Sequence, residues 1–281
     1  MTLKSMQTYT ITTQNSEVTI YNDTDGEYVV KKTRIQPFTE REQVIHKSLH
    51  YILPDCIPQI IRSYAEDEHY FNYIRKCNEL TIPITEMDVR QMIALVHQLH
   101  LLGISHCDIS PHNFMRKQDG KIVIIDFGNA TLIGTLQSYT GFTCPSPNLR
   151  KLHKNWIVDI TEDIWALGSS IYYLTYGKWL SKSYSPSGVR DDVILMFGSD
   201  SPSKEEVKTR LSPLDFQGLP VSNLALEVMS DIFSNANCDL SRYLEDEHLS
   251  KMKVGKELLI ASVNHIYQND PRIVNLLRIM I

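Results

Sequence analysis

The stretch GISHCDISPHNFMRKQDGKIVIIDFGNA, from Gly103 to Ala130, holds the polar residues that decide the fold and chemistry of this chain. Asp108 and Asn113 stand five residues apart, and the apolar run Ile122–Ile125 leads directly into Asp126. Such a run predicts a short buried strand that delivers Asp126 at its end. Two carboxylates and an amide in this order suit phosphoryl transfer. One carboxylate orients and deprotonates a hydroxyl, while the amide and the second carboxylate hold the metal of a nucleotide.

The pattern His-x-Asp-x-x-x-x-Asn, then a strand, then Asp-Phe-Gly resembles the catalytic loop and metal-binding triplet of the eukaryotic-type protein kinases. The resemblance implies a two-lobed α+β protein kinase fold, with a small mostly β lobe over about 1–78 and a larger mostly helical lobe over about 79–281. It implies a single domain over 1–281 that uses ATP and Mg²⁺. Asp108 is then the base, and Asn113 and Asp126 are metal ligands. The plainer alternatives are a common turn at Asp-Phe-Gly and a structural core histidine at His106, which is structural in kinases too.

Bulk composition is compatible with that fold and excludes other classes. The chain has 281 residues, 42% of them hydrophobic, which is enough for a two-lobed core. A net charge of -5 gives no nucleic-acid footprint. Five scattered cysteines without a Cys-x-x-Cys pair predict a reduced, intracellular (cytoplasmic) protein without a disulfide framework or zinc site. The first residues lack a signal-peptide core and no run approaches a membrane span, so we expect no membrane partner.

The first part of the chain, residues 7–35, predicts three strands rich in Thr, Val, Ile and Tyr. In kinases the first hairpin carries a glycine-rich loop whose backbone approaches the phosphates. With Val18 as the valine after that loop, the three glycine positions fall on Ile11, Thr13 and Ser16. Side chains at these positions would hinder close approach, which puts the affinity for nucleotide in question.

The third strand ends in Val29-Val30-Lys31-Lys32, and one lysine resembles the kinase lysine that grips the α- and β-phosphates. Strand alternation points Lys31 and Lys32 to opposite faces. We expect Lys31 to serve, because Val29 on its face would then lie over adenine. The alternative is that both are solvated strand lysines.

The next helix is predicted to begin at Thr39, since Thr39-x-x-Glu42 is a capping-box pattern that follows Pro37. Glu42 is also the candidate for the helix glutamate that orients Lys31. The two roles compete, because a capping glutamate lies in the first helical turn, and Glu40 is the alternative partner.

Residues 57–64 resemble the entry into the fourth kinase strand, and Tyr70–Lys76 the fifth. The hinge between the lobes is then expected near Ile74–Asn78. This places Ile74 and Cys77 at the adenine edge of the nucleotide site.

The second lobe is predicted to be helical. Apolar residues recur at helical spacing from Met87 to Leu102, and Gly103 supplies the stop. Asp163-x-Trp-x-x-Gly168 resembles the start of the large central helix of kinases, where Asp163 braces the catalytic-loop backbone. Further helices are predicted at 205–211, 224–233 and 254–267, whereas the apolar end, Val274–Ile281, is expected to pack on the large lobe.

The chain departs from the kinase pattern at two loop positions. Cys107 replaces the arginine that reads a phosphate on the activation segment, so that form of switching is not expected. Ser110 replaces a lysine that contacts the transferred phosphate, which should lower the rate because charge stabilisation dominates this reaction. A nucleophilic role for Cys107 is an alternative. Asn113-Phe114 and Ser146-x-Asn148 are similar to the casein kinase 1 and viral Ser/Thr kinase group, and a viral member would act in its host cell.

The expected function is transfer of the ATP γ-phosphoryl group to Ser/Thr hydroxyls of a protein substrate. A pseudokinase or scaffold of the same fold is one alternative, motivated by the missing glycines, Cys107 and Ser110. A small-molecule kinase for an aminoglycoside-like or choline-like alcohol is another, and the Asp163–Gly168 motif argues against it.

Overall fold

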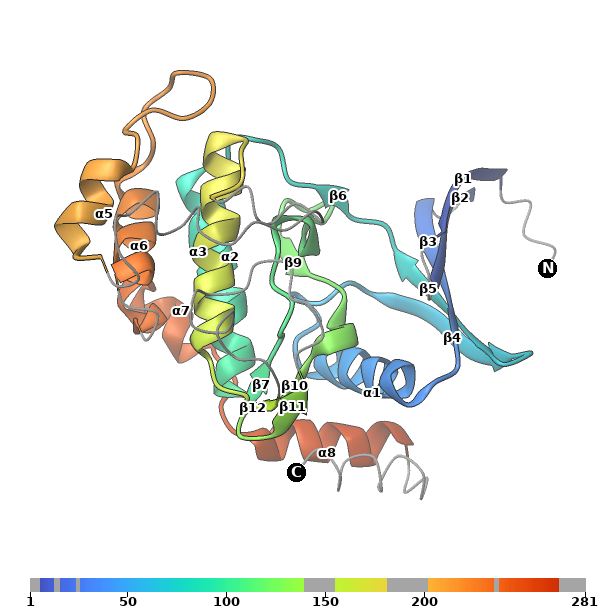
Figure 1. The fold of residues 1–281 in the computed structure, drawn as a ribbon. Helices are drawn as coiled ribbons and strands as arrows, with labels where there is room; N and C mark the ends of the chain where they lie inside the picture. The colour runs from blue at the N-terminus through green and yellow to red at the C-terminus, as the bar shows by residue number, and fades with distance from the viewer. Residues whose placement is uncertain are drawn as a thin grey trace.

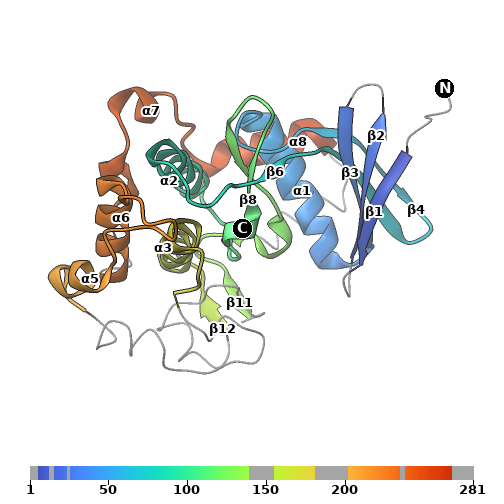
Figure 2. The ribbon, with the colours of Figure 1, turned by 90° about the horizontal axis from the view of Figure 1, so that it is seen from above.

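The computed structural model of the chain describes residues 6–12, 16–23, 26–138, 155–180, 202–234 and 238–267. A five-stranded sheet and one helix form a small lobe, and a larger, mostly helical lobe lies beside them (Figure 1). Figure 2 shows from above how the sheet and the helices α5 and α6 lie at opposite ends of the molecule. The prediction of a two-lobed α+β fold is confirmed.

The sheet of the small lobe has the order β1-β2-β3-β5-β4, and all neighbouring strands are antiparallel. Its β-branched and aromatic residues fit a pleated, half-buried surface. The β4–β5 turn places Asp67 and Glu68 at φ of 46° and 61°. Two successive positive φ angles are typical of the hairpin turn whose twist matches that of its strands. The strands are β1 (Met6–Thr12), β2 (Ser16–Asp23), β3 (Gly26–Arg34), β4 (Ile60–Glu66) and β5 (His69–Arg75).

Helix α1 (Pro37–Ile52) begins two residues before the predicted Thr39. The backbone N–H of Gln36 donates to Thr39 Oγ1 at 2.9 Å, so Thr39 is the third residue of the helix and not its cap. Pro37 occupies the first position, where a missing N–H leaves no bond unmade. The predicted Thr39–Glu42 capping box is therefore wrong, and Glu42 lies in the second turn, clear of the helix end.

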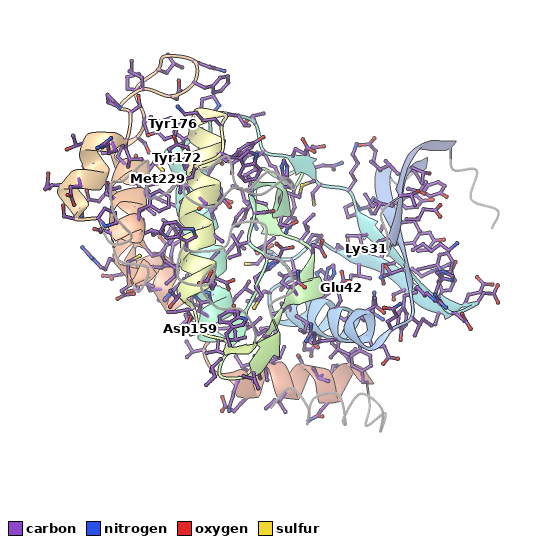
Figure 3. The ribbon with its side chains drawn as sticks, in the orientation of Figure 1. Lys31, Glu42, Asp159, Tyr172, Tyr176 and Met229 are labelled. Atoms are coloured by element: carbon purple, nitrogen blue, oxygen red, sulfur yellow. The ribbon has the colours of Figure 1, made fainter. Side chains whose placement is uncertain are left out.

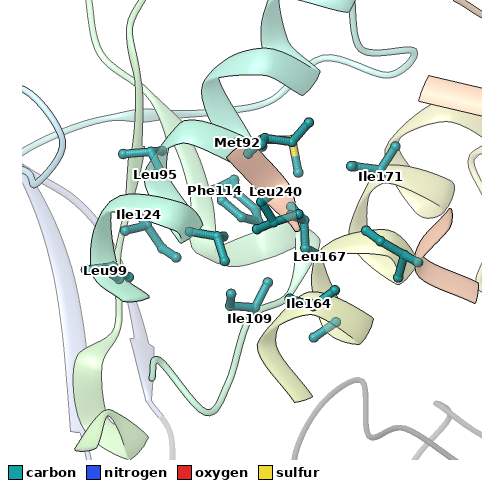
Figure 4. Close-up of a cluster of buried hydrophobic side chains, with 14 of the residues drawn as sticks. Met92, Leu95, Leu99, Ile109, Phe114, Ile124, Ile164, Leu167, Ile171 and Leu240 are labelled. Carbon is teal, nitrogen blue, oxygen red and sulfur yellow. The ribbon is translucent and has the colours of Figure 1, made fainter. Parts of the chain in front are cut away.

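The large lobe is built on two central helices, α2 (Glu86–Leu101) and α3 (Thr161–Tyr176). Thr85 caps α2, because its Oγ1 accepts from Asp88 N at 3.3 Å and Asp88 Oδ2 accepts from Thr85 N at 3.0 Å. Helix α3 is buried nearly all round, and its buried residues include polar side chains, Asp163 among them, beside the apolar majority. Figure 4 shows side chains of these helices meeting the catalytic-loop region in one core. Labelled in it are Met92, Leu95, Leu99, Ile109, Phe114, Ile124, Ile164, Leu167, Ile171 and Leu240.

Short strands and turns connect these helices, and the loop that holds Asp108 lies among them.

The helices predicted at 205–211 and 224–233 are present within one residue at each end. The sequence did not predict η5 or α7, because segments of four or five residues show no helical period. The elements are β6 (Asn78–Glu79), β7 (Ile104–Ser105), η1 (Pro111–Asn113), β8 (Phe114–Arg116), β9 (Ile122–Ile124), η2 (Phe127–Asn129), β10 (Thr131–Leu132), β11 (Leu136–Ser138), β12 (Asn155–Ile157), α5 (Lys204–Arg210), α6 (Asn223–Ser234), η5 (Leu240–Tyr243) and α7 (Asp246–Ser250).

The last described helix, α8 (Lys256–Tyr267), begins two residues after the predicted start at 254. It returns to the small lobe and lies beneath α1 in the view of Figure 1. The predicted features at Ser146–Asn148 and Val274–Ile281 lie outside the described residues. None of the helices in the described ranges is long and apolar enough to cross a membrane.

Candidate active site

Lys31 lies on β3 and points toward α1, where its Nζ is 2.6 Å from Glu42 Oε1 (Figure 3). The same Nζ is 3.3 Å from Asp126 Oδ1, so one ammonium joins the sheet, the helix and the end of β9. Lys32 points to the other face, with its Nζ 5.8 Å from the centre of the Phe71 ring. Strand alternation thus separates the two lysines, and only Lys31 reaches the carboxylates.

The acidic surroundings of Lys31 keep it charged. Burial on its own would lower the pKa of this ammonium, but attraction to Glu42 and Asp126 outweighs burial and raises the pKa above its ordinary value. Glu40, the alternative partner, lies elsewhere, with its Oε1 3.5 Å from the Tyr70 hydroxyl that donates to it. The pair is therefore Lys31 with Glu42.

The loop between β7 and η1 is held from below by Asp163 of α3, a residue only 1% exposed. Its carboxylate accepts the backbone N–H of His106 at 2.7 Å and of Cys107 at 2.9 Å, and the Nε2–H of His100 at 3.0 Å. Burial opposes ionisation of Asp163, yet these donors lower its pKa below the ordinary value. The predicted bracing role is confirmed, and it holds Cys107 at a φ of 59°, a left-handed conformation rare for such a residue.

Asp108 follows this strained residue and remains partly exposed. The Asn113 side chain closes the loop by donating from Nδ2 to the Asp108 carbonyl at 2.8 Å. Asn129 Nδ2 donates to Asp108 Oδ2 at 3.5 Å, which ties the carboxylate to η2. The Asn113 side chain therefore lies beside the Asp108 backbone.

Asp126 lies two residues after β9, at the N-cap of η2, in a left-handed conformation with φ of 65°. That turn sends its carboxylate toward Lys31 and buries the next ring, Phe127, completely. Burial opposes ionisation of Asp126, but the charge of Lys31 lowers its pKa below the ordinary value. Phe127 packs between two histidines, with ring centres 5.1 Å from His106 and 5.7 Å from His46.

His46 is a site residue that the sequence analysis missed. It lies four residues after Glu42, so both project from the same face of α1. Burial lowers the pKa of His46 to about 4, which keeps its ring neutral. The spacing from Glu42 was a usable signal, but a lone histidine in an apolar run does not show which face is the site.

A cavity of about 280 Å³ opens between the lobes beside these groups. Lys31, Glu42 and Asp126 line its charged end. Both predicted adenine-edge residues, Ile74 and Cys77, line it as well. Its apolar walls come from both lobes and comprise Val18, Val29, Ile74, Cys77, Met115 and Ile125. A concave, mostly apolar site with a few convergent polar groups is typical of small-ligand binding.

The side chains of Asn113 and Asp126 carry oxygen atoms of the kind that Mg²⁺ takes as ligands. Because Asn113 uses its amide nitrogen on the Asp108 carbonyl, its amide oxygen is the atom left for a cation. Mg²⁺ takes hard oxygen ligands and needs only one or two from the protein when phosphate and water supply the rest. Across the described part of the chain, no three His, Cys, Asp or Glu residues gather into a larger metal cage.

The two residues that depart from the kinase loop pattern, Cys107 and Ser110, are both buried. Cys107 is 1% exposed, and burial together with the charge of Asp163 raises the pKa of its thiol, which disfavours the thiolate that a nucleophilic role needs. Ser110 is 4% exposed and precedes η1. Of the expected glycine positions, Ile11 and Ser16 lie in β1 and β2, and Thr13 lies outside the described residues.

Comparison with known proteins shows which family model and which sequences this chain matches. A family model described as "Protein kinase domain" matches residues 3–234. A "cAMP-dependent protein kinase, catalytic subunit-like" of Caenorhabditis elegans is 24% identical over 196 residues, or 61% of this chain and 47% of that protein. "3-phosphoinositide-dependent protein kinase 1" of Homo sapiens is 29% identical over 131 residues, or 41% and 21%. "Sperm motility kinase Tcr mutant form" of Mus musculus is 27% identical over 137 residues, or 48% and 28%. The chain thus spans less than half the length of each of these relatives.

Proposed function

The chain belongs to the protein kinase family, and from that premise we propose that it transfers the γ-phosphoryl group of ATP to Ser or Thr hydroxyls of a protein substrate. One observation carries the proposal: Lys31 is paired with Glu42 and Asp126 at the charged end of an interlobe cavity. A kinase is competent only when its strand lysine and helix glutamate are paired and its metal-binding aspartate is in place.

Each polar residue of the proposed site then has one role. Lys31 binds the α- and β-phosphates, and Glu42 orients Lys31. Asp108 accepts the proton of the substrate hydroxyl and aims its oxygen at the γ-phosphorus. Asn113 and Asp126 hold Mg²⁺, which when bound neutralises charge on the phosphates.

The apolar walls of the cavity define the adenine end of the proposed site. Val29 and Ile125 belong to its lining from the sheet and from the end of β9. The Cys77 thiol donates to the Arg75 carbonyl at 3.7 Å, which leaves a small side chain at this edge of the cavity. Adenine is flat and largely apolar, and apolar walls of this kind complement it.

Serine and threonine are proposed as acceptors because Pro111 keeps the loop form of Ser/Thr kinases in place of the tyrosine-kinase pattern, even though Ser110 replaces the lysine of that form. A protein acceptor is proposed over a small alcohol because the Asp163–Gly168 helix is the protein-kinase element of the fold. We place the enzyme inside cells, where ATP is available and where the four described cysteines, all free thiols, stay reduced.

The test compares the wild type with Asp108→Asn in the presence of labelled ATP, Mg²⁺ and a mixed acceptor such as casein. Transfer by the wild type alone supports the proposal, and phosphoamino-acid analysis identifies the acceptor hydroxyl. Glu245→Gln is the control, since Glu245 is exposed and far along the chain from the cavity lining. Nucleotide binding without transfer would instead favour a pseudokinase, and transfer to an aminoglycoside or choline alone would favour a small-molecule kinase.

A further inference from the structure

Helix α1 carries two separate stripes of side chains. Glu42 and His46 face the cavity and form one stripe. Val44, Lys47 and Tyr51 form the other, at the spacing of three and four residues that places side chains on one helix face. The second stripe faces α8 and takes no part in the cavity. Because both stripes belong to one helix, contacts with the second stripe also affect the position of Glu42.

The start of α8 is fastened to the large lobe. Gln98 of α2 holds the backbone of Lys253 twice, accepting its N–H at 2.9 Å and donating to its carbonyl at 2.6 Å. The N–H of Gly255 donates to the Leu101 carbonyl at 3.0 Å. Leu259 is 2% exposed and belongs to the main core of the large lobe. The first turn of α8 is therefore part of that lobe.

The end of α8 is packed on α1 of the small lobe. Val263 and Val44 are each 1% exposed and form a small core of their own, against which Tyr267 packs. The Tyr267 hydroxyl donates to the backbone carbonyl of Gln43 at 3.4 Å, and Lys47 Nζ lies 6.0 Å from the centre of its ring. One short helix thus ties the back of α1 to the large lobe.

We propose that α8 is a built-in brace that holds α1 in the position where Glu42 pairs with Lys31, and that Val263 and Tyr267 are positioning residues for that pair. The inference rests on the proposed function in so far as the pair serves phosphoryl transfer. Two observations favour a brace over a passive cover. The contact lies on Gln43, Val44 and Lys47, which follow Glu42 closely on α1. The helix that makes the contact also has its other end fixed in the opposite lobe.

The loop chemistry indicates why such a brace would be needed. In kinases, activation-segment phosphorylation and the position of the helix that bears the glutamate control whether the ion pair forms. Here Cys107 stands before Asp108 and offers no cation for a phosphate. Besides α8, the contact of α1 with η2 includes a hydrogen bond from Arg41 Nη2 to the Gly128 carbonyl, long at 3.4 Å. A permanent contact behind α1 would keep the pair closed without phosphorylation.

The test weakens the α1–α8 contact and measures the hydrogen exchange of α1 in the small lobe, the hydrogen exchange of α2 in the large lobe, and kcat/KM. Val263→Ala and Val263→Asp are compared with Asn264→Asp, which adds the same charge at the next, exposed position of α8. Val263→Ile is the conservative variant. We expect both disruptive variants to speed hydrogen exchange of α1 amides, with α2 amides unchanged, and Val263→Asp to lower kcat/KM by about tenfold, a typical coupling between distant sites. Asn264→Asp and Val263→Ile should match the wild type.

A double-mutant cycle separates bracing from loss of stability. If α8 acts through the ion pair, Val263→Ala should lower kcat/KM in the wild type but have no further effect in Glu42→Gln, where the pair is already broken. Additive effects, or α1 exchange equal to that of Asn264→Asp, would overturn the brace. A wild type without transferase activity would instead defeat the proposed function, and the exchange data alone would then decide for or against the brace.

Discussion

Replacing Asp163 by alanine removes the one carboxylate that holds the catalytic loop from below. Three buried donors lose their acceptor: the N–H groups of His106 and Cys107 and the ring of His100. A buried donor left unsatisfied costs about 1–3 kcal/mol. Because the His100 ring can turn away more easily than the backbone, we count the two backbone donors and expect the free energy of unfolding to fall by about 4 kcal/mol.

The loss should depend on pH in a defined direction. The pKa of Asp163 is below its ordinary value, so its stabilisation is complete above the unfolded-state pKa of about 4 and is lost as pH falls through the lower folded-state pKa. The difference between the wild type and Asp163→Ala is therefore largest at neutral pH. Urea unfolding followed by tryptophan fluorescence gives the free energies.

The control is Asp246→Ala, an exposed carboxylate in the first turn of α7. Asp163→Asn keeps one carbonyl acceptor and should lose about half as much as Asp163→Ala, since one of the two backbone donors stays paired. Phosphoryl transfer should fall as well, because the strained Cys107 conformation that presents Asp108 is no longer held. A change in unfolding free energy equal to that of the control would refute the reasoning, since it would mean that the loop holds its own shape.

Three further predictions concern other parts of the site and core. Lys31→Met should abolish nucleotide binding measured by calorimetry, whereas Lys32→Met, on the opposite strand face, should leave the dissociation constant unchanged; equal losses would contradict the assignment. Burial lowers the pKa of His46 to about 4, so the unfolded chain binds a proton that the folded chain does not, and stability present above pH 6.5 should fall by about 3 kcal/mol toward pH 4. His46→Leu should remove that part of the pH profile in urea unfolding, and an unchanged profile would show that the ring is not buried neutral. Gly168→Ala should lower stability by about 1 kcal/mol, because a Cβ there would lie 2.7 Å from Ile232 Cγ2 while alanine favours the helix; a higher midpoint would mean that Ile232 moves aside.

Much of the site could be predicted from the sequence because local rules settle it. Strand alternation alone separates Lys31 from Lys32, and the structure points them to opposite faces. The buried run before Asp126 predicts a strand, and the strand is there. The motif at Asp163 predicts a brace under the catalytic loop, and its carboxylate accepts two of that loop's N–H groups.

The choice between two roles for Glu42 could not be made from the sequence. Thr39 and Glu42 have capping-box spacing, but a helix start depends on which residue first adopts helical angles, and Pro37 with Gln36 began the helix earlier. The helix cap is Gln36, three residues before Thr39, and this difference moves Glu42 from the capping turn to the second turn. The ion pair with Lys31 follows from that shift, because a glutamate occupied by the helix end could not also reach the strand.

Helix α8 is a case in which the periodicity of the sequence predicts an apolar face but not the elements that this face contacts. Leu259, Val263 and Tyr267 recur every four residues, so the sequence predicts one stripe on one helix face. It does not predict that this stripe has two partners, the large-lobe core at Leu259 and α1 at Val263 and Tyr267. An apolar stripe requires burial but does not specify its partner. The partner depends on where the segment before the helix places the helix start. Here the Gln98 contacts with Lys253 fix that point close to the end of α2, and from it a helix of twelve residues reaches across to α1. Because its two ends bury side chains in different lobes, α8 joins the back of α1 to the lobe that carries Asp108, in addition to the contact of α1 with η2.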